Sequence, residues 1–353
     1  MELGAAMRYF TVFAFLCVVS LLSSALFAQS IPSSSTIPVS IYRDYLIIAQ
    51  GTIGGLEKRN VIIDTGAYPS VVSPEIAKKL HLSGYVEELG AVEHNIHSAV
   101  VSLPSLQLGS VRSEHLRVIV RDLTEFDRRL GIHVDALVGL DALYPNSFRI
   151  DYRGKKIILG PVDTLAFALP IQWRNSTACI DINVNDRAAH LLLDTGAADI
   201  MLFGQRLTHI AHESGDNVAS MNLGGAFTLR QILLKHLEAG GSDLGPRDVY
   251  LSDAKNMDRY PYDGLMATAG FRFRQVAFDF DRQLFSWEPI RRKKLPKTTL
   301  MAGHPGSPEP SLAMSPSSVN GEATRPGSLC GTNPLGNDVI CTVPTFDLQG
   351  STR

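Results

Sequence analysis

The sequence predicts an all-β protein, mainly β with short helices, built of two similar lobes that span residues 37–160 and 165–290. The first observation behind this prediction is a series of short apolar runs separated by turn residues, which is the pattern of strands and hairpins. The second is a strand-like motif that ends at Asp64 and occurs again, later in the chain, at Asp194. The third is a set of further landmarks that return at nearly the same spacing.

Two of these landmarks repeat at nearly the spacing that separates Asp64 from Asp194. Asp135 opens the apolar run Ala136-Leu137-Val138, and Asp263 opens Gly264-Leu265-Met266. Asp151, inside a strand-like segment, has its counterpart in Asp279. Matching landmarks in one order and at nearly one offset indicate an internal repeat. We therefore interpret the chain as two copies of one β-rich unit.

The composition is that of a globular protein of ordinary polarity. The chain has 353 residues, 45% of them hydrophobic and 19% charged, which is enough for two domains with their own cores. A formal net charge of -2 gives no sign of an electrostatic nucleic-acid binder. We expect no nucleic-acid partner, and the remaining partners have to be inferred from sites.

The N-terminal segment 1–28 has the features of a secretory signal peptide. A basic residue, Arg8, precedes an apolar run that ends in small residues at Ala28. The sequence therefore predicts export to the periplasm or the medium, with cleavage after Ala28. The alternative is a membrane anchor formed by residues 9–28, since this run is about long enough to span a bilayer. Residues 29–36 read as a linker.

The elements of the first lobe follow in order from the apolar runs and turn residues. A helix is expected over residues 73–80, because Ser73 can cap its first turn, Pro74 suits the first helical position and Gly84 follows its end. A hairpin is expected over residues 148–159. The strands expected are Tyr45–Ala49, Val61–Ile63, Val71–Val72, Val100–Val101, Leu106–Leu108, Leu116–Val120 and Asp135–Leu140.

The segment after the second lobe differs in character from everything before it. Residues 291–353 begin with four basic residues, Arg291 to Lys294, and contain 8 of the 19 prolines. A stretch with so little apolar periodicity cannot offset the entropy of ordering, so we expect a disordered tail. Within it, Cys330 and Cys341 can form a disulfide after export, but the sequence does not decide whether they do.

Few other residues suggest chemistry. Cys179 stands alone in an expected strand, where a buried apolar role is favoured over a nucleophilic one. His94 with His97, and His209 with His212, have a spacing that would place each pair on one helical face. No further ligand accompanies either pair, so we expect no metal site and no other cofactor.

The repeated acid is the strongest functional signal. Asp64 and Asp194 each follow three apolar residues and precede a threonine and a glycine. An acid at the end of a buried strand is held at the edge of a core, where desolvation and nearby charge tune its pKa. Two such carboxyls brought together cannot both ionise easily, so one retains a proton. The pair can then activate water with one member and polarise a carbonyl with the other.

These motifs resemble the active-site motifs of retropepsin-like aspartic proteases. The resemblance rests on Asp64-Thr65-Gly66-Ala67, on Asp194-Thr195-Gly196-Ala197, and on Leu137-Val138-Gly139, which is similar to a second family signature beneath the catalytic loop. It covers both lobes and implies two acid-protease, β-barrel-like lobes with the active site between them. Viral members assemble one site from two identical chains, whereas here one chain supplies both halves.

The resemblance implies an aspartic endopeptidase with roles for particular residues. Asp64 and Asp194 are the expected catalytic pair, and the substrate is a peptide or protein. Thr65 and Thr195 can hydrogen-bond across the lobe interface and lock the two loops together. Gly66 and Gly196 permit a tight turn and close backbone approach. We expect a monomer, because both acids belong to one chain.

Three glycines lie where the family places its flap hairpins. Gly90 follows Asp64 at nearly the same distance along the chain as Gly224 and Gly225 follow Asp194. Glycine at a hairpin tip supplies positive φ and mobility, which suits a lid over a cleft. The alternative, equally compatible with the sequence, is a hairpin without a lid role.

The chain departs from the family pattern at three positions. Ala267 stands where the first lobe has Gly139, and its methyl group could shift the support beneath Asp194. Ala67 and Ala197 replace a hydroxyl residue that bonds the carboxylate in many members. Losing that bond raises the acid's pKa, which predicts a mildly acidic to neutral optimum. Two other functions remain open: a catalytically silent peptide-binding or protein-binding protein, and one lobe that is active only through dimerisation.

Overall fold

The computed structural model describes residues 34–290, except residues 92–93, 224, 256, 258–259 and 270–272. The predicted signal peptide and tail lie outside the described residues. The described strands belong to one compact unit that begins at Ser35. Strand β1 starts at this residue, so it takes up the end of the segment expected to be a linker. In the part of the chain that the structure describes, no helix is long and apolar enough to cross a membrane.

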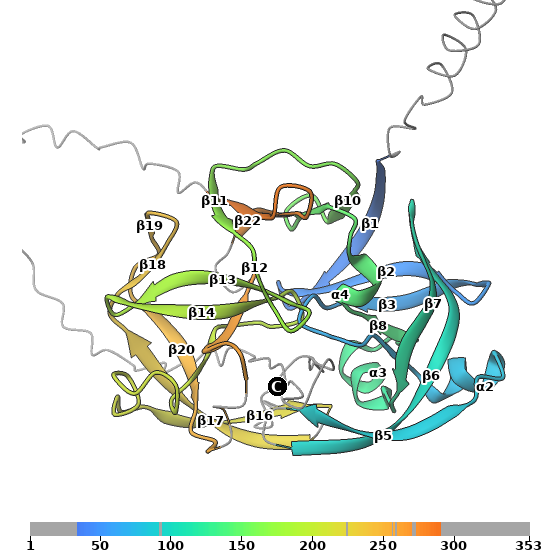
Figure 1. The fold of residues 1–353 in the computed structure, drawn as a ribbon, viewed down its shortest axis with the longest axis horizontal. Helices are drawn as coiled ribbons and strands as arrows, with labels where there is room; N and C mark the ends of the chain where they lie inside the picture. Colours follow the sequence, from blue (N-terminus) through green and yellow to red (C-terminus); the bar gives the residue numbers. More distant parts are fainter. Residues whose placement is uncertain are drawn as a thin grey trace, which may run out of the picture. The chain divides into compact units, whose positions relative to one another are not determined.

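The structure is dominated by strands arranged in two sheets, which confirms the predicted all-β, two-lobed fold (Figure 1). The strands of the first half are β1 (Ser35–Tyr42), β2 (Leu46–Ile53), β3 (Leu56–Ile63), β4 (Val71–Val72), β5 (Gly84–Ala91), β6 (His94–Leu108), β7 (Val111–Val120), β8 (Ala136–Val138), β9 (Phe148–Asp151) and β10 (Lys156–Leu159).

The second half contributes a similar series. Its strands are β11 (Phe167–Pro170), β12 (Gln172–Arg174), β13 (Thr177–Val184), β14 (Arg187–Asp194), β15 (Met201–Phe203), β16 (Asp216–Asn222), β17 (Gly225–Leu234), β18 (Leu237–Ala239), β19 (Ser242–Asp243), β20 (Arg247–Ser252), β21 (Gly264–Ala267), β22 (Phe273–Asp279) and β23 (Leu284–Pro289).

The strands that carry the two acids have the same neighbours. Strand β3 pairs in parallel with β8, and β8 also pairs antiparallel with β4, which is parallel to β7. In the second half β14 pairs in parallel with β21, which pairs antiparallel with β15, itself parallel to β20. The apolar triplets Val61–Ile63 and Leu191–Leu193 are buried throughout. Asp64 and Asp194 therefore follow buried strands at equivalent points of their sheets.

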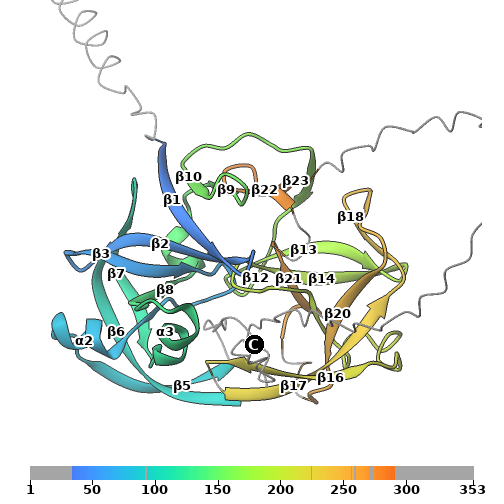
Figure 2. The ribbon, with the colours of Figure 1, turned by 180° about the vertical axis from the view of Figure 1, so that it is seen from behind.

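The two halves also share part of one sheet, which the sequence did not predict. Strand β9, from the first half, pairs antiparallel with β22, from the second, and the order continues through β23 to β11. Phe148 and Phe278 face each other in this register and stack with ring centroids 4.7 Å apart. Burial of such aromatic surface contributes on the order of 2 kcal/mol per ring. Figure 2 shows these strands from behind.

Three short helices are present among the described residues. Helix α2 (Pro74–Lys79) begins as predicted, with Ser73 accepting a hydrogen bond from the Ile76 N–H. Helix α3 (Thr124–Leu130) was not predicted, although Gly131 ends it in the left-handed conformation. Helix α4 (Leu140–Leu143) is a single turn directly after β8. It replaces the end of the strand that the sequence suggested over residues 135–140.

Candidate active site

The two predicted catalytic acids lie at equivalent strand ends. The Asp64 N–H donates to the Val138 carbonyl at 3.0 Å, which extends the pairing of β3 with β8. Asp194, the last residue of β14, lies in register with Ala267 of β21. Both acids are fully buried. The strand pairing thus fixes each acid in a rigid, water-poor position.

The neighbouring threonines join the two loops by reciprocal hydrogen bonds, as expected. The Thr65 N–H donates to Thr195 Oγ1 at 2.9 Å, and the Thr195 N–H donates to Thr65 Oγ1 at 3.1 Å. Each hydroxyl in turn donates across the interface, Thr65 to the Leu193 carbonyl and Thr195 to the Ile63 carbonyl, both at 2.9 Å. Four buried bonds therefore hold the acid loops against each other.

The glycines after the threonines bring backbone donors to the acids. The Gly66 N–H donates to Asp64 Oδ1 at 3.0 Å, and the Gly196 N–H donates to Asp194 Oδ1 at 2.7 Å. Ala197 adds a second N–H to Asp194 Oδ1 at 3.0 Å. A Cβ atom at position 196 would lie 2.7 Å from the carboxyl carbon of Asp64, so only glycine fits between the loops.

The carboxyl group of Asp64 lies against the loop of Asp194, since a Cβ atom at position 196 would also lie 2.8 Å from both Asp64 carboxyl oxygens. Among the described residues, no N–H or hydroxyl group donates to Oδ2 of either acid, and both Oδ2 atoms are buried. Burial raises the pKa of Asp64 to about 6, against the lowering effect of the neighbouring Asp194 carboxyl and of backbone donors. Burial, and then the charge of Asp64, raise the pKa of Asp194 well above its ordinary value. The pair therefore holds a proton at pH values where a free carboxyl would be ionised.

The first lobe supports its acid loop with a serine and a buried acid that the sequence did not single out. The Ser70 hydroxyl donates to Asp141 Oδ1 at 2.6 Å, and the Ser70 N–H donates to Asp141 Oδ2 at 2.9 Å. Ser70 Oγ also accepts from the Gly139 N–H at 2.8 Å. Burial raises the pKa of Asp141 to about 6. Neither residue carries a local signal, because the contact depends on strand pairing between distant parts of the chain.

The backbone follows different paths at Gly139 and Ala267, so only the first position requires glycine. A Cβ atom at Gly139 would lie 2.3 Å from the Ala67 carbonyl oxygen, so the first lobe requires glycine there. In the second lobe β21 continues through Ala267, which is buried and paired with Asp194, and the next N–H, of Thr268, donates to the Asp194 carbonyl at 3.1 Å. The methyl group of Ala267 therefore leaves the strand pairing beneath Asp194 intact.

Hairpins occur at both predicted flap positions. Gly90 lies in β5 opposite Asn95 of β6, and Gly225 opens β17 opposite Asn222 of β16. Gly224 lies outside the described residues. Next to it, the carbonyl of Leu223 accepts a hydrogen bond from Arg121 Nη2 of the first half at 2.7 Å. The structure thus connects the second hairpin with the first lobe.

The side chain of Leu223 also packs against the first lobe. It is buried in an apolar cluster that includes Leu89, Ile96 and Phe126. These residues come from β5, β6 and α3, and the end of β5 lies beside the β16–β17 hairpin in Figures 1 and 2. Burial lowers the pKa of Arg121, although it remains a cation. Among the described residues, the hydrogen bond from Arg121 and the buried side chain of Leu223 therefore connect the hairpin end to the first lobe.

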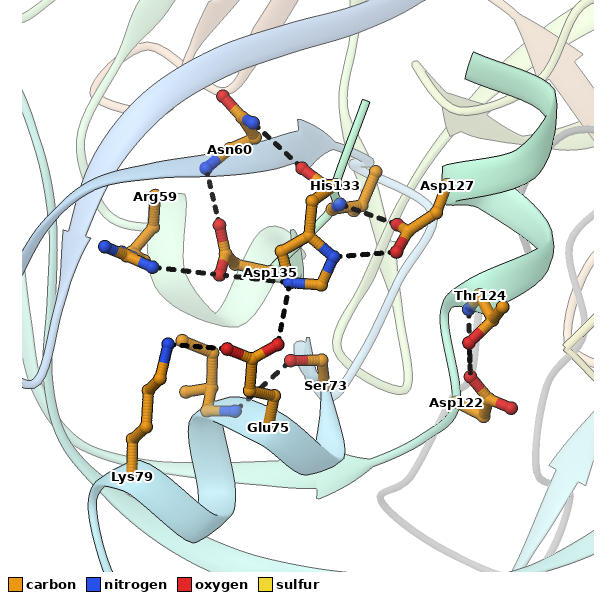
Figure 3. A network of polar contacts seen from close by, with 12 residues as sticks. Arg59, Asn60, Ser73, Glu75, Lys79, Asp122, Thr124, Asp127, His133 and Asp135 are labelled. Carbon is orange, nitrogen blue, oxygen red and sulfur yellow. Dashed lines mark hydrogen bonds and ion pairs between the residues drawn. The ribbon is translucent and has the colours of Figure 1, made fainter. Parts of the chain in front are cut away.

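A polar network on the first lobe lies around the start of β8 rather than at the dyad (Figure 3). The carboxyl of Asp135 accepts from the Asn60 N–H at 2.9 Å and forms an ion pair with Arg59 at 3.6 Å. His133 lies 2.7 Å from Asp127, and this contact raises the pKa of His133. These contacts join β3 to β8, so we assign the network a structural role.

The second lobe has an equivalent contact at the repeated acid. The carboxyl of Asp263 accepts from the His190 N–H at 2.9 Å and from Arg206 at 2.7 Å. Asp263 is the counterpart of Asp135 in the repeat, and both acids bond the backbone just before an apolar triplet. The repeated Asp135 and Asp263 therefore anchor the strands that carry Asp64 and Asp194.

The other candidate residues take structural positions. His94 and His97 belong to strand β6, so their predicted placement on a helical face is wrong. His209 lies outside any helix and contacts the Val184 carbonyl at 3.0 Å. No group of three or more potential metal ligands occurs within the described ranges. Cys179 is buried in β13, and burial raises the pKa of its thiol to about 12.

Comparison with known proteins bears on the first lobe. Residues 49–142 match the sequence model of a family described as aspartyl protease. This match supports an aspartyl protease family. The matched segment runs from β2 into α4 and contains Asp64, whereas Asp194 lies beyond it. It supports aspartic-type protease activity, and hence a hydrolase, in general terms. No curated protein sequence matches the chain.

Proposed function

We propose that the protein is a retropepsin-like aspartic endopeptidase in which one chain supplies both members of the catalytic pair, Asp64 and Asp194. The observation that carries the proposal is the full burial of both carboxyl groups on loops that pack against each other, with the Asp64 carboxyl against Gly196. The reciprocal threonine bonds support it, since they hold both acids in place within one chain. The equivalent strand neighbours of β3 and β14 support an origin of the two lobes by duplication.

In the proposed reaction one carboxyl is ionised and the other protonated. The ionised carboxyl takes a proton from water, whose oxygen attacks the peptide carbonyl carbon. The protonated carboxyl gives its proton to the carbonyl oxygen, which forms a tetrahedral diol. When the carbon–nitrogen bond breaks, the leaving nitrogen receives a proton from the carboxyl that took it from water, and the other carboxylate regains a proton from the diol. The pair returns to its starting state without a covalent adduct.

The substrate proposed is an extended peptide segment of a protein. The hairpins β5–β6 and β16–β17 serve as flaps in this proposal, since they offer strand edges that can bond a peptide backbone. We further propose that the protein acts after export, on the basis of residues 1–28, and that it acts as a monomer. No cofactor other than water is required by this chemistry.

The test is cleavage of denatured casein by the purified full chain, followed by mass spectrometry of the products. We expect Asp64→Asn and Asp194→Asn each to reduce kcat by at least about a thousandfold, because each acid has a separate role in the proton transfers. Asp186→Asn is the matched control, since this side chain is 85% exposed. It should cleave casein at the wild-type rate.

The other functions give different results in the same assay. A silent binder retains peptide affinity and cleaves nothing at any pH. A site formed by the first lobes of two chains survives Asp194→Asn, and its rate per chain rises with protein concentration. Full hydrolysis by either Asn variant contradicts the proposed pair.

A further inference from the structure

The two acid loops are supported by different side chains. In the first lobe, Ser70 and Asp141 bond each other beneath the loop of Asp64. At the corresponding positions of the repeat the second lobe has Ile200 and Ala269, which have no polar side-chain atoms. The loop of Asp194 therefore lacks this pair and requires support of another kind.

A tyrosine from the first half reaches the second loop. The hydroxyl of Tyr152 lies 2.6 Å from Thr268 Oγ1. Thr268 is fully buried, and its N–H donates to the Asp194 carbonyl at 3.1 Å. A single residue thus links the Tyr152 hydroxyl to the backbone of the acid.

The repeat does not offer the same link to the loop of Asp64. The counterpart of Tyr152, next after Asp279, is Phe280 of the second lobe, and the counterpart of Thr268 is Leu140 of the first lobe. Neither side chain has a hydroxyl group. The loop of Asp64 is therefore supported by the Ser70–Asp141 pair, and the loop of Asp194 by the Tyr152–Thr268 pair.

The backbone and the packing of Tyr152 suit a fixed hydroxyl. Tyr152 follows β9 directly, and its N–H donates to the Arg274 carbonyl at 3.1 Å. Its side chain is partly buried and packs against the apolar cores. Desolvation raises the pKa of Tyr152, so the hydroxyl stays protonated.

We propose that Tyr152 is a positioning residue for Asp194, acting through its hydrogen bond to Thr268. The proposal rests on the proposed function, because it assigns Tyr152 a part in holding the second catalytic acid. It also assigns the two lobes distinct means of support. Loss of the Tyr152 hydroxyl should therefore disturb Asp194 and leave the support of Asp64 intact.

The primary test replaces Tyr152 by Phe in the full chain and measures casein cleavage against pH. We expect kcat to fall roughly tenfold to a hundredfold with little change in KM, since a small displacement of a reacting group has effects of this size. The acid limb of the kcat profile should move to higher pH, because the surroundings of the pair become less polar.

The matched control is Tyr45→Phe. The Tyr45 hydroxyl is also buried, and no partner for it occurs among the described residues. This variant removes the same atom without removing a hydrogen bond, so kcat and the pH profile should match the wild type. Equal rates and equal profiles for Tyr152→Phe and Tyr45→Phe overturn the proposal.

Changes at Thr268 test the route of the effect. Thr268→Val removes the partner hydroxyl and should reproduce the loss seen in Tyr152→Phe, whereas Thr268→Ser retains the hydroxyl and should keep activity near the wild-type value. The double variant Tyr152→Phe/Thr268→Val should be no slower than either single variant, because both remove one interaction. Fully additive losses contradict a shared bond.

A readout that does not depend on hydrolysis separates this proposal from the proposed function. Carbon-13 NMR of labelled aspartate carboxyls follows the titration of Asp194 directly, with Asp194→Asn used to assign its signal. A wild-type chain that cleaves nothing refutes the endopeptidase. In that case, an altered Asp194 titration in Tyr152→Phe, absent in Tyr45→Phe, still supports the positioning role, and identical titrations refute it.

Discussion

At the scale of single residues, burial dominates the chemistry of the acid pair. Asp64 and Asp194 have no exposed surface, and desolvation is the largest effect on the pKa of each. The backbone N–H groups of Gly66 and Gly196 oppose this effect only in part. The alanines at positions 67 and 197 add no side-chain donor. The pair is therefore set to share a proton at higher pH than exposed acids would.

The first prediction concerns the pH dependence of cleavage. Burial raises the pKa of Asp64 to about 6, so the pair loses its first proton as the pH rises through this range. Activity should rise over the same range and fall again when the second proton of the pair is lost. A profile of kcat/KM with casein should peak at mildly acidic to neutral pH. A maximum at about pH 3 contradicts the prediction.

The second prediction concerns the free energy of unfolding of Asp64→Asn. A carboxyl whose pKa is raised on folding favours the folded state below its unfolded pKa, and this contribution is lost as the pH rises through about 6. Removing the charge should therefore stabilise the protein at pH 7 by about 1–3 kcal/mol and have little effect at about pH 4. Urea unfolding at both pH values measures the difference, with Asp186→Asn as the control. Destabilisation at pH 7 contradicts it.

At the scale of elements, hairpins and short helices surround the acid loops. The β16–β17 hairpin reaches the first lobe through Leu223, whose carbonyl accepts from Arg121. Helix α3 supplies Phe126 to the apolar cluster that buries Leu223. A hairpin that contacts the opposite lobe through its end can open when those contacts break, which suits a flap.

The third prediction concerns this hairpin. Arg121→Gln removes a charged donor from the Leu223 carbonyl, so amide hydrogen exchange should increase in β16 and β17. KM for casein should rise about tenfold to a hundredfold with a smaller change in kcat, since a hydrogen bond from a charged group contributes about 1.5–3 kcal/mol. Arg112→Gln, which removes an exposed ion pair with Glu114, is the control. If amide hydrogen exchange is unchanged in both variants, the Arg121–Leu223 hydrogen bond does not hold the hairpin.

At the scale of the whole molecule, two of the features that join the halves bear directly on the acid pair. One is the shared sheet, in which β9 pairs with β22. The other is the set of four buried hydrogen bonds made by Thr65 and Thr195. The sheet contributes apolar area, whereas the threonines fix the geometry of the acids. The geometry of the acid pair therefore depends on contacts between residues far apart in the chain.

The fourth prediction concerns these threonines. Thr195→Val deletes the acceptor of the Thr65 N–H and the donor to the Ile63 carbonyl, leaving two buried polar groups unpaired. The free energy of unfolding should fall by about 2–4 kcal/mol and casein cleavage should be largely lost, because the acids lose their alignment. Thr228→Val, at an exposed strand position, is the control. A wild-type free energy of unfolding and a wild-type rate of casein cleavage for Thr195→Val would falsify the proposed role of the reciprocal threonine bonds.

Several features of the protein are specified by local chemistry and could be predicted from the sequence alone. These are the buried apolar triplets that end in Asp64 and Asp194, helix α2 with its Ser73 cap, and the β9–β10 hairpin. Each depends on residues close together in the chain, whose propensities and spacing can be recognised from the sequence.

The support of the repeated acid, by contrast, follows only from the folded chain. Different side chains support the two acid loops: Ser70 and Asp141 lie beneath the loop of Asp64, and Tyr152 and Thr268 support the loop of Asp194. The members of each pair are far apart in the sequence, and the shared sheet joins β9 to β22 across a similar distance. Such contacts depend on strand order and register, which follow from the packing of the whole core and leave no local pattern.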